Sequence, residues 1–309
     1  MCGSIHMISR QEMWSMHMEF VKMHGLGNDF IMIDDTDIGQ KRHRAGFVAE
    51  SGCCESGELL SVSDERTPAL VRQLCDRHRG IGADGVICVC DASHPQADFR
   101  MKLYNADGSM AQMCGNGIRC LGKYVYDHGK TEKVNLRIET DAGIRRLQLI
   151  KNEETDRIGM VRVDMGTPDF VPEHIPARFS AFQPVCVSMG NPHCVLFVDS
   201  REALEQFPLK REGTFLGTLE QFPEGVNVEA AWVQDPGNIR MRVWERGCGE
   251  TFACGTGACA VAAAAMRQRK CGASVQIRMP GGTLQIQYDR RYGHLYLTGP
   301  AEEICRGKF

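Results

Sequence analysis

The chain has 309 residues, a formal net charge of −3 and 43% hydrophobic residues, which is typical of a globular protein with two domains. The nearly neutral charge excludes the basic footprint of a nucleic-acid-binding protein, and no apolar run is long enough for a membrane-spanning helix. The chain has 15 cysteines but no recognisable signal peptide. We therefore expect reduced thiols and a cytoplasmic location rather than a disulfide framework.

The first part of the chain predicts two short strands around a glycine-rich turn. Residues 1–17 match neither a signal nor a transit peptide, and we interpret them as an N-terminal extension. Phe20–Met23 and Ile31–Asp34 are predicted strands, and the segment His24–Phe30 between them is predicted to form the turn. Residues from about 37 to 66 are charged and lack periodicity, so we predict an inserted loop there.

The rest of the chain alternates between predicted strands and turns. A helix is predicted around Pro68–His78, before a strand at Val86–Cys90. The further predicted strands are Leu136–Glu139, Gly143–Ile150, Gly159–Asp164, Val185–Ser188, Cys194–Asp199, Ser274–Met279, Leu284–Tyr288 and His294–Thr298. The second half repeats the order of the first: a strand, a Gly-Asn turn and a strand.

One stretch occurs twice without a gap. Cys114 follows Arg100 by 14 positions, and Cys254 follows Arg240 by the same 14. Each copy begins with alternating apolar residues, turns at glycine, reaches Cys-Gly-x-Gly and continues with a helical pattern. This repeat predicts an α/β fold of the α+β type with two pseudo-symmetric domains. Each domain is a curved, mostly antiparallel sheet around a central helix, and the active site lies in the cleft between them.

The repeat also sets the expected domain boundaries. We expect an N-terminal domain at residues 18–158 and a C-terminal domain at residues 159–298. The terminal strand at residues 299–309 is expected to return to the N-terminal domain.

Each repeated cysteine directly precedes a predicted helix, where unpaired N–H groups favour negative charge. That position is expected to lower the pKa of the thiol and to hold a carboxylate. Two such thiols, Cys114 and Cys254, could remove a proton from one face of a carbon and return one to the other face. This reaction inverts a stereocentre without a cofactor.

Three other classes of protein also use cysteine side chains for their function. A thiol-disulfide oxidoreductase has Cys-x-x-Cys, which this sequence lacks. A cysteine-dependent hydrolase needs one nucleophile and one base, which leaves the second Cys-Gly-x-Gly unexplained. A zinc-binding interaction protein needs clustered ligands, whereas these cysteines are scattered. A single Cys-Gly-x-Gly would indicate structural packing, but two equivalent copies favour catalysis.

From about Met18 onward, the sequence resembles the diaminopimelate epimerases, which are amino-acid epimerases of lysine biosynthesis independent of pyridoxal phosphate. The resemblance is carried by eight stretches in the family's order. They are His24-Gly-Leu-Gly-Asn-Asp-Phe, Asn105-Ala-Asp-Gly-Ser, Cys114-Gly-Asn-Gly-Ile-Arg-Cys, Ser188-Met-Gly-Asn-Pro-His-Cys, Val226-Asn-Val-Glu, Glu245-Arg-Gly-Cys-Gly-Glu-Thr, Ala253-Cys-Gly-Thr-Gly-Ala and Thr298-Gly-Pro-Ala.

The resemblance implies a role for each matching residue. Cys114 and Cys254 are the acid/base thiols, and His193 and Glu245 tune their protonation. The implied substrate-binding residues are Asn28, Asn105, Gly115, Asn116, Asn191, Asn227, Glu245, Arg246, Gly255 and Thr256. Arg246 suits a distal carboxylate and Glu245 suits an ammonium group.

The implied activity is the conversion of LL-2,6-diaminopimelate to meso-diaminopimelate, in the biosynthesis of lysine and peptidoglycan precursors. The resemblance implies a small-molecule substrate, a homodimer, no cofactor and no metal. The alternatives are a proline or hydroxyproline racemase of the same fold, or a cysteine-dependent hydrolase or redox protein. The racemases need no arginine for a distal carboxylate, so Glu245-Arg246 discriminates against them.

Overall fold

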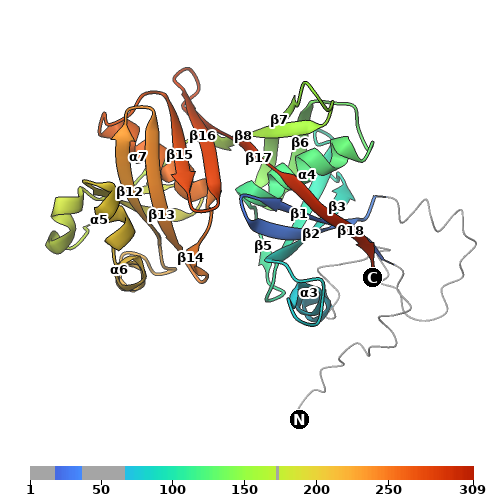
Figure 1. Ribbon diagram of the computed structural model, residues 1–309, viewed down its shortest axis with the longest axis horizontal. Helices are drawn as coiled ribbons and strands as arrows, with labels where there is room; N and C mark the ends of the chain where they lie inside the picture. The colour runs from blue at the N-terminus through green and yellow to red at the C-terminus, as the bar shows by residue number, and fades with distance from the viewer. Residues whose placement is uncertain (1–17, 37–66, 172–173) are drawn as a thin grey trace, which may run out of the picture. The chain divides into compact units, whose positions relative to one another are not determined.

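The computed structural model describes residues 18–36, 67–171 and 174–309 (Figure 1). The predicted N-terminal extension and the body of the predicted insertion lie outside the described residues. Contacts divide the chain into two compact units. The first holds residues up to Gly25, Asp29–Leu149 and Ala301–Phe309, and the second holds Leu26–Asn28 and Ile150–Pro300.

The first unit combines antiparallel and parallel strand pairs. Its elements are β1 (Glu19–Gly25), β2 (Asn28–Asp34), α3 (Thr67–Cys75), β3 (Gly85–Asp91), β4 (Phe99–Asn105), β5 (Met110–Ala111), α4 (Gly115–Asp127), β6 (Asn135–Thr140), β7 (Gly143–Lys151) and β18 (Glu302–Lys308). The pairs β1–β18, β3–β4, β4–β5 and β6–β7 are antiparallel, while β2–β3 and β4–β6 are parallel. Parallel neighbours need a crossover connection, and α4 lies in the one that joins β4 to β6.

Apolar side chains explain why helices cover this sheet on two faces. Ile31 and Ile33 of β2 belong to a buried cluster with Leu70 and Leu74 of α3. Successive strand residues point to opposite faces, so Phe30 faces the other way, toward Gly117 of α4. A pair of strands covered on both faces needs a continuous apolar run, which is the pattern of β2 and β3.

The predicted helix around Pro68–His78 ends three residues early, at Cys75. Asp76 explains the stop, because its Oδ1 accepts hydrogen bonds from the backbone N–H groups of His78 and Arg79 at 2.8 and 2.9 Å. An aspartate that bonds to nearby backbone competes with helix continuation.

The second unit repeats this plan with additional helices. Its elements are β8 (Ile158–Gly166), β9 (Asp169–Phe170), the 3-10 helix η1 (Ala177–Phe182), β10 (Val185–Ser188), β11 (Pro192–Val198), α5 (Arg201–Gln206), α6 (Leu209–Leu216), β12 (Asn227–Asp235), β13 (Asn238–Glu245), β14 (Gly249–Thr251), α7 (Gly255–Arg267), β15 (Ser274–Met279), β16 (Gly282–Asp289) and β17 (His294–Pro300). The pairs β11–β12 and β13–β15 are parallel, and β17 pairs with β8 in antiparallel fashion.

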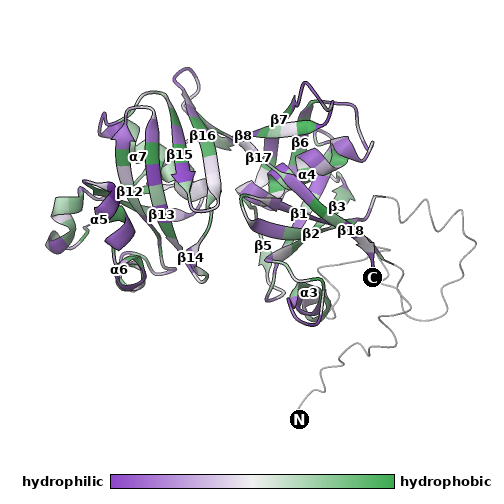
Figure 2. Cartoon of the chain, in the orientation of Figure 1, coloured by the Kyte–Doolittle hydropathy of each residue, from purple (hydrophilic) through white to green (hydrophobic). Residues whose placement is uncertain are grey.

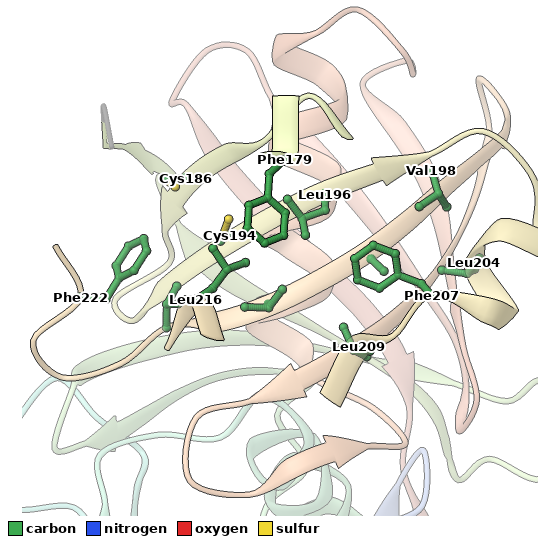
Figure 3. Packing of buried hydrophobic residues seen from close by; sticks show 13 residues of the cluster. Phe179, Cys186, Cys194, Leu196, Val198, Leu204, Phe207, Leu209, Leu216 and Phe222 are labelled. Carbon is green, nitrogen blue, oxygen red and sulfur yellow. The ribbon is translucent and has the colours of Figure 1, made fainter. Parts of the chain in front are cut away.

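Two kinds of helix surface cover the second sheet. The 3-10 helix, α5 and α6 bury an apolar cluster that includes Phe179, Leu204 and Leu216, together with Leu196 of β11 (Figure 3). On the other face lies α7, whose alanines at 258, 260 and 262–265 are buried. Small side chains let this helix approach the sheet closely.

Hydropathy alternates along β15, and so does burial (Figure 2). Along β15 the residues alternate between exposed and buried, as expected for a strand with one covered face. Along β11 six consecutive residues are buried, because helices cover both of its faces.

The sequence repeat appears as a repeat of strand register. Leu103 pairs with Ala111 in the first unit, and Val243 pairs with Thr251 in the second, 140 positions later in both strands (243 − 103 and 251 − 111). Each hairpin then leads into a helix that begins at Gly115 or Gly255. The predicted fold class, a mixed α/β protein built mainly of sheet in two similar halves, is confirmed.

Candidate functional site

Cys254 occupies the N-cap position of α7, directly before Gly255. Its Sγ accepts a hydrogen bond from the backbone N–H of Gly257 at 3.4 Å, and it lies 3.5 Å from Oγ1 of Thr256. Cys254 is only 5% exposed. The sulfur is therefore held at the positive end of the helix by groups that can donate to it.

The protonation of Cys254 corrects one expectation. Burial raises the pKa of the Cys254 thiol well above its ordinary value, and the negative charges of Glu245 and Glu229 raise it further. The hydrogen bonds from Thr256 and Gly257 lower the pKa, which is the direction predicted for a helix start. The predicted net lowering of the Cys254 pKa is wrong, because the desolvation of a buried thiolate outweighs the hydrogen bonds from the helix N–H groups.

Glu245, the last residue of β13, lies beside Cys254. Its Oε1 accepts a hydrogen bond from Thr251 Oγ1. Burial raises the pKa of the Glu245 carboxyl group, whereas hydrogen bonds from Thr251 and Cys254 lower it, and the net direction is upward. A carboxyl group that retains its proton more readily can share a proton with a neighbouring thiol.

A buried His–Glu pair adjoins the same helix start. Nδ1 of His193 lies 2.6 Å from Oε1 of Glu229, and both side chains are fully buried. Nε2 of His193 lies 3.1 Å from Oδ1 of Asn191. The amide nitrogen of Asn191 donates to Oγ1 of Thr256 at 3.4 Å. These contacts connect Glu229 to Cys254 through three intervening side chains.

Sequence reasoning did not select Glu229 as a site residue. The sequence did contain an indication, because Glu229 is a lone carboxylate within the apolar run of β12. A buried carboxylate needs a hydrogen-bonding or charged partner. The parallel pairing of β11 with β12 supplies that partner, since it brings the two strands side by side.

Asn227 and Arg246 are joined through the backbone. Oδ1 of Asn227 accepts from the backbone N–H of Arg246 at 2.9 Å, and its Nδ2 donates to the carbonyl of Pro192 at 3.0 Å. Asn227 thus fastens the end of β13 to the start of β11. Arg246 is exposed, and its guanidinium donates to the backbone carbonyl of Glu224 at 2.9 Å.

In the first unit, Cys114 occupies the N-cap position of α4 and is half-buried. Behind it, Arg119 is fully buried and donates to the carbonyl of Gly115 at 2.9 Å and to Oδ1 of Asn116 at 3.0 Å. Arg119 lies in the cysteine motif, but sequence reasoning assigned it no role. It fixes the first turn of α4, which directly follows the cysteine.

The remaining predicted residues lie at strand ends. Asn105 ends β4, is exposed, and donates from its Nδ2 to Oγ of Ser109 at 3.0 Å. Asn28 begins β2 and groups with the second unit. The structure therefore gathers Cys254, Thr256 and the Asn191–His193 pair into one network, and it places Cys114 with Gly115 and Asn116 at another helix start.

In residues 18–36, 67–171 and 174–309, no three His, Cys, Asp or Glu side chains are grouped so that they could hold a metal ion. The helices of this described part are all too short or too polar to cross a membrane.

Solved structures share the fold of this chain. A hydroxyproline epimerase of Agrobacterium vitis aligns with a TM-score of 0.68 and 16% identity over 96% of this chain and 93% of that chain. A phenazine biosynthesis protein of the PhzF family from Bacillus anthracis aligns with a TM-score of 0.69 and 15% identity over 94% and 98%. These likenesses show a shared fold.

Sequence comparison identifies the family. The profile described as "Diaminopimelate epimerase" matches residues 58–171 and 185–304. Proteins named diaminopimelate epimerase are 38% identical in Methanococcus maripaludis (strain C6) and 41% identical in Moorella thermoacetica, each over 94% of this chain and 99% of the relative. The chain belongs to the diaminopimelate epimerase family, which is a family of isomerases.

Proposed function

We propose that this protein converts LL-2,6-diaminopimelate to meso-diaminopimelate without a cofactor, using Cys114 and Cys254 as a pair of acid/base groups. The main support for this proposal is that two cysteines occupy the N-cap positions of equivalent helices in the two repeated halves. Relatives of 38% to 41% identity over nearly their whole length bear the name of this activity.

In the proposed mechanism, one sulfur is a thiolate and removes the α-proton, while the other is a thiol and delivers a proton to the opposite face. The raised pKa of Cys254 supports its assignment as the thiol in the resting protein. Cys114 is then the resting base, and the roles exchange when the reaction runs backward. The α-carboxylate is held by the N–H groups of Gly115 and Asn116 and of Gly255 and Thr256.

The rest of the proposed site recognises the two ends of the substrate. Arg246 is exposed and carries the planar fork that binds a carboxylate in bidentate geometry, so we assign it to the distal carboxylate. Glu245 is assigned to an ammonium group as well as to the tuning of Cys254. His193 shares the tuning role, and Asn28, Asn105, Asn191 and Asn227 are assigned to orientation of the substrate.

The proposed substrate is tested by comparing substrates on one preparation. LL-diaminopimelate should be converted to the meso isomer, while L-proline and trans-4-hydroxy-L-proline should not be racemised. Arg246→Leu should raise KM for diaminopimelate by roughly 10- to 100-fold, since a charge-assisted bidentate contact contributes about 1.5–3 kcal/mol. Efficient racemisation of proline would contradict the assignment.

A homodimer and a cytoplasmic location are also proposed. The dimer is supported by the family resemblance alone, and the location by the many cysteines of the chain. Light scattering coupled to size-exclusion chromatography should give twice the mass of 34.4 kDa. A monomer mass at assay concentration would refute the dimer.

A further inference from the structure

The buried pair of His193 and Glu229 is costly for the fold, so it calls for an explanation. Both side chains are fully buried. Oε2 of Glu229 has no hydrogen-bond partner within the described ranges. Burial of a charge without full hydrogen bonding costs free energy, and apolar residues could fill the same strand position without that cost.

Each ring nitrogen of His193 faces an oxygen atom that can accept a hydrogen bond. Nδ1 faces the carboxylate of Glu229, and Nε2 faces Oδ1 of Asn191. The Asn191 oxygen points toward the ring because its amide nitrogen is directed at Thr256. A neutral imidazole has one N–H and cannot donate to both oxygens. An imidazolium satisfies both of them, and the carboxylate balances its charge.

These donors form a chain with one direction. If the ring is an imidazolium, its Nε2–H donates to Asn191, Asn191 donates to Oγ1 of Thr256, and the hydroxyl of Thr256 can donate to the sulfur of Cys254. The Thr256 hydrogen bond lowers the pKa of Cys254, as expected if it points toward the sulfur. Hydrogen bonds in such a chain polarise one another.

The first turn of α7 is shaped to admit the carboxylate. A Cβ atom on Gly257 would lie 2.7 Å from Oε1 of Glu229 and 3.3 Å from Cβ of Cys254. Glycine at this position is therefore what allows Glu229 to lie directly against the turn that carries the sulfur.

The other repeat supplies an internal comparison. Phe30 pairs with Gly85 on parallel strands, as His193 pairs with Asn227. A Cβ on Gly117 would meet Cδ1 of Ile87 at 2.8 Å, as one on Gly257 would meet Glu229. Phe30 and Ile87 thus take the places of His193 and Glu229 beneath Cys114. The fold can fill these places with apolar side chains, so the charged pair is a special feature of the Cys254 side.

We propose that Glu229 is a positioning residue for the epimerase reaction: it holds the His193 ring doubly protonated, so that the chain through Asn191 and Thr256 donates to the Cys254 sulfur. The inference rests on the proposed function, in which Cys254 must become a thiolate in one direction of the reaction. Glu229 acts only through His193.

The test begins with the wild-type full-length protein labelled with ¹⁵N-histidine. At neutral pH, both ring nitrogens of His193 should give the shifts of protonated nitrogen, and the proton on Nδ1 should be far downfield and slow to exchange. The His193 signals are assigned by their loss in His193→Gln. A wild-type ring with one bare nitrogen overturns the proposal. This measurement needs no substrate, so it is independent of the proposed activity.

Glu229→Gln then tests the consequence. The His193 ring should lose one proton, and kcat should fall roughly 10- to 100-fold, as is typical when a partner that orients a reacting group is removed. The loss in kcat/KM should be equal in both directions, because the substrates fix the equilibrium constant. Glu229→Asp should recover part of the rate. A folded Glu229→Gln protein with unchanged ring signals and unchanged kcat would overturn the proposal.

Glu212→Gln is the matched control. Glu212 is also a buried carboxylate of the second unit, 4% exposed, but its partners are Arg178 and Arg211. Its loss should lower stability while the His193 signals and kcat stay as in the wild type. If Glu212→Gln changes both signals and rate as Glu229→Gln does, the effect is a general one of stability and the positioning role is wrong.

Discussion

Replacement of Gly257 by alanine should damage activity far more than stability. The added Cβ would lie 2.7 Å from Oε1 of Glu229, whereas ordinary contacts of this kind are about 3.3–3.6 Å. The carboxylate or the helix start must therefore shift by about 0.6–0.9 Å. Overpacking of this size costs about 1–3 kcal/mol, and the better helix propensity of alanine returns about 1 kcal/mol. The net loss in free energy of unfolding should be about 0–2 kcal/mol.

The effect on rate should be larger because the shift occurs next to Cys254. A misplacement of about 1 Å in a reacting group can lower kcat by about 100-fold. The assay compares kcat for conversion of LL-diaminopimelate with the free energy of unfolding from urea titration. Gly272→Ala is the control, because apart from its chain neighbours no atom of the described residues lies within 4 Å of its added Cβ, and both quantities should stay near wild type. Wild-type kcat in Gly257→Ala would refute the reasoning.

Three further predictions concern catalysis, pH and metals. Cys114→Ala and Cys254→Ala should each abolish epimerisation, since each direction needs both an acid and a base; full turnover by either variant would contradict this, while a Cys→Ser variant should retain one-sided proton exchange. Burial raises the pKa of Asp29, but hydrogen bonds and charge from Arg77 and Lys22 outweigh it and lower the pKa from 3.8 to about 2. Asp29 therefore stabilises the fold above pH 3.8 by about 2 kcal/mol, and this stabilisation is lost as pH falls toward 2. The free energies of unfolding of wild type and Asp29→Asn, measured by urea titration, should converge between pH 3.8 and 2. A difference in free energy that stays constant over this range would contradict the assignment. Activity should survive dialysis against a chelator, and activity restored only by a divalent metal would contradict the proposed mechanism.

The repeated stretch made much of the fold predictable. Alternating apolar residues before Cys114 and Cys254 predicted strands with one buried face, and β4 and β13 lie there. The burial of β13 alternates as predicted, whereas residues 101–104 of β4 are all buried, so the prediction of a single buried face is wrong for β4. The helical pattern after each Cys-Gly-x-Gly predicted a helix directly after each cysteine, and α4 and α7 begin at Gly115 and Gly255. Local periodicity sufficed here because both copies carry the same pattern.

The helices α5 and α6 were not predicted, although a local signal exists. Ser200 caps α5, and its Oγ accepts a hydrogen bond from the backbone N–H of Ala203 at 3.1 Å. Helices of six and eight residues are too short for a clear period. They are stabilised by packing on the cluster around Phe179 and Leu204, which is a tertiary effect.

The sequence indicated which residues belong to the candidate site, but it did not indicate how the surroundings shift the pKa of Cys254. His193 and Glu245 follow from the motifs, but the pKa of Cys254 depends on how deeply the sulfur is buried and on which carboxylates face it. Glu229 reaches the site through the register of β11 with β12, and spacing along one strand does not reveal that register.

The incorporation of solvent deuterium during conversion of LL-diaminopimelate tests the central claim most directly. In D₂O at low conversion, the meso product should carry one deuterium at the inverted carbon, while recovered LL substrate should still carry hydrogen. This pattern follows because one sulfur takes the substrate proton and the other delivers a proton that came from solvent. A product that retains the original proton, or deuterium appearing equally in substrate and product from the start, would contradict a mechanism with two cysteines.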